Sequence, residues 1–162
     1  MKKISFFDTK PYDRIYFDKA AEGKYKIDYI ESKLNSSTAV LTAGSDAVIA
    51  FVNDTIDKDT INILYNNNIR IISLRCAGFN NVDFNSAYEK IHITRVPAYS
   101  PYAVAEHTMA LLLTINRKIH RAYNRVREFN FSLNGLIGFD IYKKTIGVIG
   151  TGKIGRAFIN IC

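Results

Sequence analysis

Short apolar runs alternate with amphipathic stretches along the first 96 residues. Runs typical of buried or half-buried strands cover residues 3–7, 25–30, 47–52, 69–74 and 91–96. Apolar residues at helical spacing, or helix-start residues such as Pro11 and Asp83, predict helices over residues 11–22, 57–65 and 83–90. Strands that alternate with helices favour a parallel α/β sheet with helices on both faces.

The pattern changes after residue 96. Pro97 and Pro101 mark a linker, with Ser100 as the expected N-cap and Pro101 as the first residue of a helix that extends to about residue 125. The first half of this helix is apolar nearly all round, which indicates burial between domains or between subunits. Glycines then mark a loop over residues 130–140, and residues 145–150 read as a short apolar strand.

A glycine motif follows that expected strand. Gly150, Gly152 and Gly155 have the spacing GxGxxG. In a dinucleotide site the first glycine permits a tight turn, the second leaves room for the pyrophosphate, and the third lets the next helix pack closely on the strand. A plain turn is the alternative. An acidic residue is expected about 20 positions further on to hold the ribose, whereas seven residues follow Gly155.

Composition and charge narrow the protein class. The chain is 48% hydrophobic and 23% charged, as in a folded soluble protein, and no apolar run approaches the roughly 18 residues of a membrane span. The formal charge of +7 comes mostly from residues 100–162, with five cations between Arg117 and Arg127. We interpret these as the solvated end of a helix and expect no nucleic-acid or membrane partner. Asp8, Lys10 and Asp13 interrupt the basic N-terminus before the apolar core of a signal peptide can form, so a cytoplasmic location is expected.

The cysteines and histidines show no metal-site spacing. Cys76 and Cys162 stand far apart in the sequence and neither belongs to a CxxC pair. We expect reduced thiols, with Cys76 buried, and no bound metal.

Three blocks of sequence, residues 74–83, 96–107 and 144–155, resemble the D-2-hydroxyacid dehydrogenase family in its own order and spacing. Within that family the second block is most like the D-lactate dehydrogenase branch. The resemblance covers the whole chain, and it implies that the chain corresponds to the N-terminal half of such an enzyme. It implies a flavodoxin-like substrate domain over residues 1–98, followed over residues 99–162 by a crossover helix and the truncated start of a Rossmann domain. It also implies a homodimer formed through the helix over residues 101–125.

The resemblance further implies reversible hydride transfer between NADH and a 2-oxo acid such as pyruvate. The catalytic Arg, Glu and His of the family match no residue of this chain, which is therefore expected to be inactive alone. The residues that do match family positions are Ala77, Gly78 and Tyr99 at the substrate, Val104 beside the nicotinamide, and Gly150, Gly152, Lys153, Ile154 and Gly155 at the pyrophosphate.

Three other residues have simpler interpretations. Glu106 and His107 are adjacent on a helix and do not face each other, so we expect His107 to pack rather than to catalyse. For Arg75 we expect a structural ion pair.

Two further functions remain as alternatives: a non-catalytic interaction or dimerisation module derived from such an enzyme, and another nucleotide enzyme of the Rossmann type, such as a methyltransferase.

Overall fold

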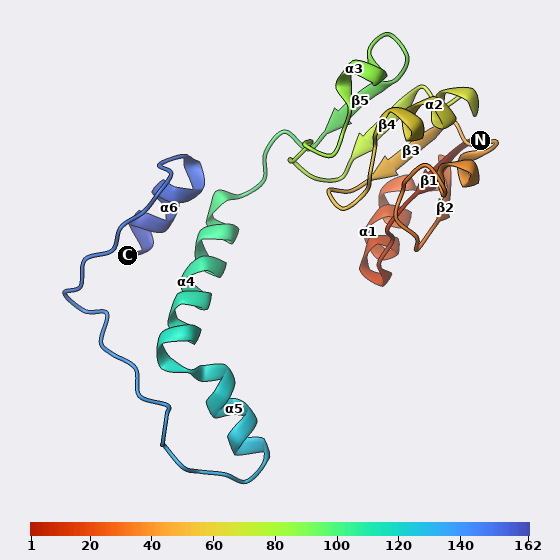
Figure 1. Ribbon diagram of the computed structural model, residues 1–162. Coiled ribbons are helices and arrows are strands. Elements are labelled where there is room, and N and C mark those ends of the chain that lie inside the picture. Colours follow the sequence, from red (N-terminus) through yellow and green to blue (C-terminus); the bar gives the residue numbers. More distant parts are fainter. The chain divides into compact units, whose positions relative to one another are not determined.

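The computed structural model describes all 162 residues, which divide into two units, Met1–Tyr99 and Ser100–Cys162. The first unit contains one parallel sheet of five strands in the order β2-β1-β3-β4-β5 (Figure 1). Its strands are β1 (Lys2–Phe6), β2 (Tyr25–Tyr29), β3 (Ala47–Ala50), β4 (Ile71–Leu74) and β5 (His92–Arg95). This order confirms the α/β, flavodoxin-like fold.

Four helical segments connect these strands: α1 (Pro11–Ala21), the 3₁₀ helix η1 (Ala39–Thr42), α2 (Lys58–Asn66) and α3 (Phe84–Ala87). The carboxylate of Asp57 caps α2 by accepting from the N–H of Thr60, and Asp83 caps α3 by accepting from the N–H of Ser86. The capping role expected for Asp83 is thus confirmed, whereas η1 is an element that the sequence pattern did not predict.

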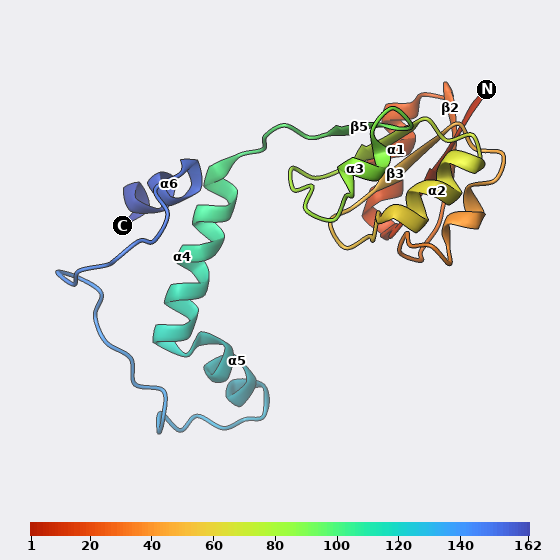
Figure 2. The same ribbon diagram turned by 45° about the horizontal axis from the view of Figure 1, so that its top comes forward.

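The two faces of the sheet are covered unequally (Figure 2). Right-handed crossovers place η1, α2 and α3 on one face and α1 on the other. The first face carries the core, in which Val48, Ile72 and Leu74 pack with the fully buried Ile61 and Leu64.

On the opposite face α1 covers the sheet at β1 and β2. Phe6 there meets Phe17 edge to face at a centroid distance of 4.7 Å. Over β4 and β5 the same face has no helix, and Ile71 is 37% exposed. The expectation that helices cover both faces is therefore only partly correct, because α1 is the one helix of this unit on that side.

The second unit contains α4 (Pro101–Arg117), α5 (Ile119–Arg127) and α6 (Lys153–Ile161). The expected helix to residue 125 is wrong, because Lys118 adopts a left-handed conformation (φ 54°) that ends α4 and turns the chain into α5. Pro101 begins α4 as predicted. Ser100 occupies the N-cap position, but its side chain makes no capping hydrogen bond, which corrects that expectation.

The expected strand at residues 145–150 does not form, and these residues have no regular secondary structure. A strand needs the ladder of a neighbouring strand, and no segment of the second unit provides one. Residues 130–140 are irregular, as predicted.

Packing in the second unit centres on the contact between α4 and α6. Ala105 of α4 is fully buried against Ala157 and Phe158 of α6. Leu111, Leu113 and Ile115 are exposed by 40% or more, so within one copy of the chain α4 is not buried on several sides. His107 is exposed as well, which contradicts the expectation that it packs. None of the helices combines the length and hydropathy that a bilayer crossing requires.

The end of α4 holds the irregular segment that follows α5. The side-chain amide of Asn116 donates to the carbonyl of Phe139 at 2.7 Å and accepts from the N–H of Phe139 at 3.1 Å. Gly138 comes so close that a Cβ at this position would overlap the carbonyl oxygen of Asn116. This pairing fixes residues 138–139 on α4 without any strand.

Candidate functional site

The loop after β4 lies at the carboxyl edge of the parallel sheet, where ligands of such folds bind. It contains Ala77 and Gly78, two of the residues predicted to meet substrate. Their N–H groups donate to no acceptor in the chain. Gly78 is exposed and Ala77 is half-buried. Two neighbouring, unpaired N–H donors at a sheet edge are suited to a carboxylate.

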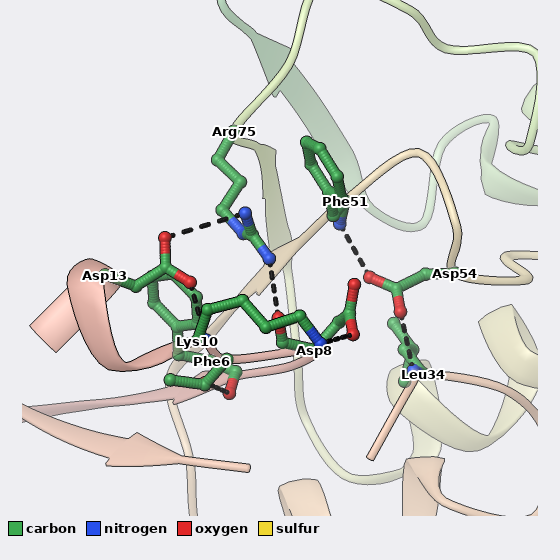
Figure 3. Close-up of polar contacts among 9 residues, drawn as sticks. Phe6, Asp8, Lys10, Asp13, Leu34, Phe51, Asp54 and Arg75 are labelled. Carbon is green, nitrogen blue, oxygen red and sulfur yellow. Dashed lines mark hydrogen bonds and ion pairs between the residues drawn. The ribbon is translucent and has the colours of Figure 1, made fainter. Parts of the chain in front are cut away.

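A cluster of charged side chains surrounds Arg75, the residue that follows β4 (Figure 3). The guanidinium of Arg75 donates to the carbonyl of Asp8 at 2.7 Å and lies 3.6 Å from the carboxylate of Asp13. It also lies over the ring of Phe51, 4.2 Å from the centroid, and 5.2 Å from that of Phe6. The prediction of a structural ion pair at Arg75 is confirmed. Arg75 joins the ends of β1, β3 and β4 and so fixes the base of the loop.

Two further carboxylates complete the cluster. Asp8 accepts from Lys10 at 2.7 Å, and this hydrogen bond raises the pKa of Lys10. Asp54 is 2% exposed and accepts from the N–H groups of Leu34 (2.8 Å) and Phe51 (2.6 Å). Burial raises the pKa of Asp54, and the two N–H donors oppose that effect. These contacts are within the protein, so the cluster serves the fold.

Cys76 begins the loop. Its thiol is only half-buried, which corrects the expectation that Cys76 is buried, and the partial burial raises its pKa. Its Sγ donates to the carbonyl of Gly78 at 3.4 Å. The raised pKa keeps the thiol protonated near neutral pH, so Cys76 has the properties of a structural side chain. Both cysteines are free thiols, and no group of three or more His, Cys, Asp or Glu side chains could hold a metal ion.

Tyr99 ends the first unit in a segment without regular secondary structure, with its side chain 59% exposed. Val104 belongs to the second unit, half-buried in the first turn of α4. The packing of α4 on α6 brings the helix that carries Val104 against the helix that carries Lys153, Ile154 and Gly155.

The glycine loop has the geometry that a dinucleotide fingerprint requires. Gly150 adopts a φ of +93°, which permits the tight turn. A Cβ at Gly155 would overlap the carbonyl oxygen of Gly150, so only glycine lets α6 begin here. A Cβ at Gly152 would meet nothing within 4 Å, which leaves open space on that side of the loop.

The first turn of α6 adds donors to this space. The N–H groups of Lys153, Ile154 and Gly155 have no acceptor in the chain. Unpaired N–H groups and the helix dipole favour an anion at such a terminus. Beside it, a hollow of about 310 Å³ between α4 and α6 is lined by Pro101, Tyr102, Lys153, Arg156, Ala157 and Asn160. The residues present therefore fit a pyrophosphate.

Sequence reasoning missed two contacts that shape these sites. Arg95, at the end of β5, donates to the carbonyl of Ala77, and Asn116 holds residues 138–139. No periodicity or spacing marks either residue, because each contact joins a side chain to the backbone of a segment distant in sequence.

Comparison with known proteins identifies the relatives of this chain. The model of the D-isomer specific 2-hydroxyacid dehydrogenase catalytic domain matches residues 4–137. The 2-hydroxyacid dehydrogenase homolog 1 of Schizosaccharomyces pombe is 56% identical over 155 residues, which cover 94% of this chain and 47% of that protein.

Solved structures show the same relationship. The apo-structure of D-lactate dehydrogenase from Escherichia coli is 46% identical, with a TM-score of 0.91, over 98% of this chain and 51% of that one. D-lactate dehydrogenase from Aquifex aeolicus, complexed with NAD and lactic acid, is 26% identical, with a TM-score of 0.75, over 98% and 47% of the two chains. The chain spans about half the length of the curated relatives it matches.

Proposed function

The chain belongs to the D-isomer specific 2-hydroxyacid dehydrogenase family, and we propose that it forms the N-terminal half of an NAD-dependent D-lactate dehydrogenase. The observation that carries this proposal is the glycine loop. Gly150, Gly152 and Gly155 meet the steric demands of a dinucleotide fingerprint. They do so in a chain that is 46% identical to the D-lactate dehydrogenase of Escherichia coli.

The proposed reaction reduces a 2-oxo acid to the D-2-hydroxy acid with oxidation of NADH, and it is reversible. Bound NADH supplies the hydride that reduces C2. The N–H groups of Ala77 and Gly78 hold the substrate carboxylate, and Tyr99 forms a wall of the substrate pocket. Val104 would lie beside the nicotinamide, while Gly152 and the first turn of α6, with Lys153 and Ile154, would hold the pyrophosphate.

Residues outside these 162 complete the enzyme in this proposal. The acid–base histidine, its glutamate partner and the arginine that clamps the carboxylate come from those residues. The residues outside these 162 also cover the sheet face over β4 and β5, where Ile71 is exposed, since parallel sheets are normally covered on both faces. The 162-residue chain alone therefore has no turnover, because it lacks acid–base assistance worth about 10²–10⁴-fold in rate. A cytoplasmic location and a preference for NAD stay predictions.

The partner proposed for the second unit is another copy of the same protein. The exposed apolar side chains of this unit include Leu111, Leu113 and Ile115 on α4 and Ile119 and Tyr123 on α5. A homodimer through residues 101–127 would bury these side chains. Sedimentation at micromolar concentration tests it: we expect twice the 18.4 kDa of one chain, and Leu113→Glu should return the mass to that of a monomer.

A pair of glycine variants tests the two binding roles in the complete polypeptide that contains this chain. An alanine at Gly78 meets Val52 at an ordinary 3.6 Å, and one at Gly152 meets nothing. Both substitutions therefore leave the unliganded fold intact, and each serves as the control for the other.

We expect Gly78→Ala to raise the KM for pyruvate about tenfold, roughly 1.4 kcal/mol, with little change in the KM for NADH. Gly152→Ala should raise the KM for NADH about tenfold, with little change in the KM for pyruvate. Equal effects of both variants on both KM values would contradict the assignment of the two loops.

A further inference from the structure

The loop after β4 that contains Cys76, Ala77 and Gly78, here called the substrate loop, forms one hydrogen-bonded unit with the segment after β5. The N–H of Val96 donates to the carbonyl of Cys76 at 3.1 Å. The Nη1 of Arg95 donates to the carbonyl of Ala77 at 3.1 Å. Two successive carbonyls of the loop are thereby held from the same neighbouring segment.

These two carbonyls belong to the peptide planes that carry the two unpaired donors. In a trans peptide the C=O of one residue and the N–H of the next lie in one plane and point in opposite directions. Fixing the Cys76 carbonyl therefore fixes the direction of the Ala77 N–H. Fixing the Ala77 carbonyl in the same way fixes the Gly78 N–H.

We propose that Arg95 is a positioning residue for the substrate carboxylate, because its guanidinium orients the Ala77–Gly78 peptide plane so that the Gly78 N–H points outward as a donor. This rests on the proposed function of the loop in binding a 2-oxo acid. A charged donor on the Ala77 carbonyl also polarises that peptide and strengthens its N–H as a donor.

The remaining contacts of Arg95 explain why an arginine suits this position. Its Nη1 also reaches the carbonyls of Pro97 (3.3 Å) and Val96 (3.4 Å) in the segment that leads to α4. Its guanidinium lies over the ring of Phe79 at 5.2 Å from the centroid, and Phe79 meets Phe84 of α3 edge to face. Lysine offers no planar group for the stack on Phe79.

Arg95 differs from Arg75, the other arginine at this loop. The side chain of Arg75 is 11% exposed. It donates to the backbone carbonyl of Asp8 and pairs with the carboxylate of Asp13, so it supports the fold. Arg95 is exposed, and all its hydrogen bonds go to the backbone of the loop and the linker. Losing Arg95 should therefore disturb the loop and leave the fold in place.

The first test measures backbone dynamics in the ¹⁵N-labelled 162-residue chain by NMR. In Arg95→Gln we expect the order parameter of the Gly78 N–H to fall from about 0.85 towards 0.6, because the Ala77 carbonyl loses its charged donor. The exchange of Ile72 in the core should not change. The order parameter of Gly78 in Arg95→Lys should lie between those of the unsubstituted chain and Arg95→Gln.

The matched control is Arg70→Gln. Arg70 is also exposed, donates to two backbone carbonyls and lies over a tyrosine ring, but it precedes β4 at the other end of the strand. It should leave Val96, Ala77 and Gly78 unchanged. The proposal is overturned if the order parameter of the Gly78 N–H in Arg95→Gln equals that of the unsubstituted chain. An equal effect of Arg70→Gln, or a uniform rise in exchange across the first unit, overturns it as well.

The second test is kinetic, in the complete polypeptide with pyruvate and NADH. Turnover by the unmodified protein tests the proposed function by itself. Where turnover is present, Arg95→Gln should raise the KM for pyruvate about five- to tenfold, while kcat and the KM for NADH stay within about twofold. Arg95→Lys should recover part of the loss. A fall in kcat with an unchanged KM for pyruvate overturns the positioning role, and without turnover the NMR result still decides whether Arg95 orients the loop.

Discussion

The buried guanidinium of Arg75 offers the clearest stability prediction. Arg75→Met removes the hydrogen bond to Asp8 and leaves the Asp13 carboxylate, 6% exposed, without its cation. Removing one partner of a buried pair costs about 3–5 kcal/mol. Part of this is recovered, because the Nε of Arg75 is buried without any partner, and relieving such a group returns about 1–3 kcal/mol. We therefore expect the free energy of unfolding of the first unit to fall by about 2 kcal/mol.

Urea unfolding at pH 7 measures this change, with far-UV circular dichroism for the whole chain and resolved amide signals for the first unit. The control is Arg70→Met, in which an exposed arginine with carbonyl and aromatic contacts is lost, at an expected cost below about 1 kcal/mol. In an Asp13→Asn background, Arg75→Met should cost clearly less, because the uncompensated charge is gone. Equal losses for Arg75→Met and Arg70→Met would refute the reasoning.

Three other substitutions have definite expected outcomes. Gly155→Ala should displace α6 from the turn at Gly150, seen as shifted amide signals over residues 150–158, and should abolish NADH binding in the complete polypeptide. Gly138→Ala should break the pairing with Asn116, seen as faster proteolysis within residues 130–145. Asp54→Asn should destabilise the chain by about 1–3 kcal/mol, because an amide cannot accept from both N–H groups. Since burial raises the pKa of Asp54, its ionisation opposes folding above that pKa, and this cost disappears as the pH falls through it. The free energy of unfolding of the unsubstituted chain exceeds that of Asp54→Asn, and this difference, measured by urea unfolding, should therefore be larger at pH 4.5 than at pH 7.

The parallel sheet was predictable from sequence because each strand is a dense apolar run between helix signals. Val48 and Ile72, for example, are buried in the core as the pattern requires. The glycine loop was predictable for a different reason. The steric demands at Gly150 and Gly155 arise within six residues, so the motif itself contains them.

Other features depend on partners that a local pattern does not contain. Residues 145–150 have the composition of a strand, but a strand forms only beside another strand. Lys118 breaks the long helix although no glycine or proline marks the position. The contact of Arg95 with Ala77 depends on β4 and β5 being neighbours in the sheet.

The most direct test of the account is the rate of NADH oxidation with pyruvate, measured on the complete polypeptide and on the 162-residue chain at equal concentration. We expect turnover by the complete polypeptide, with D-lactate and not L-lactate reducing NAD in the reverse direction. We expect no rate above the blank for the 162-residue chain. Turnover by the 162-residue chain, or a complete polypeptide that binds NADH and reduces no 2-oxo acid, would contradict it.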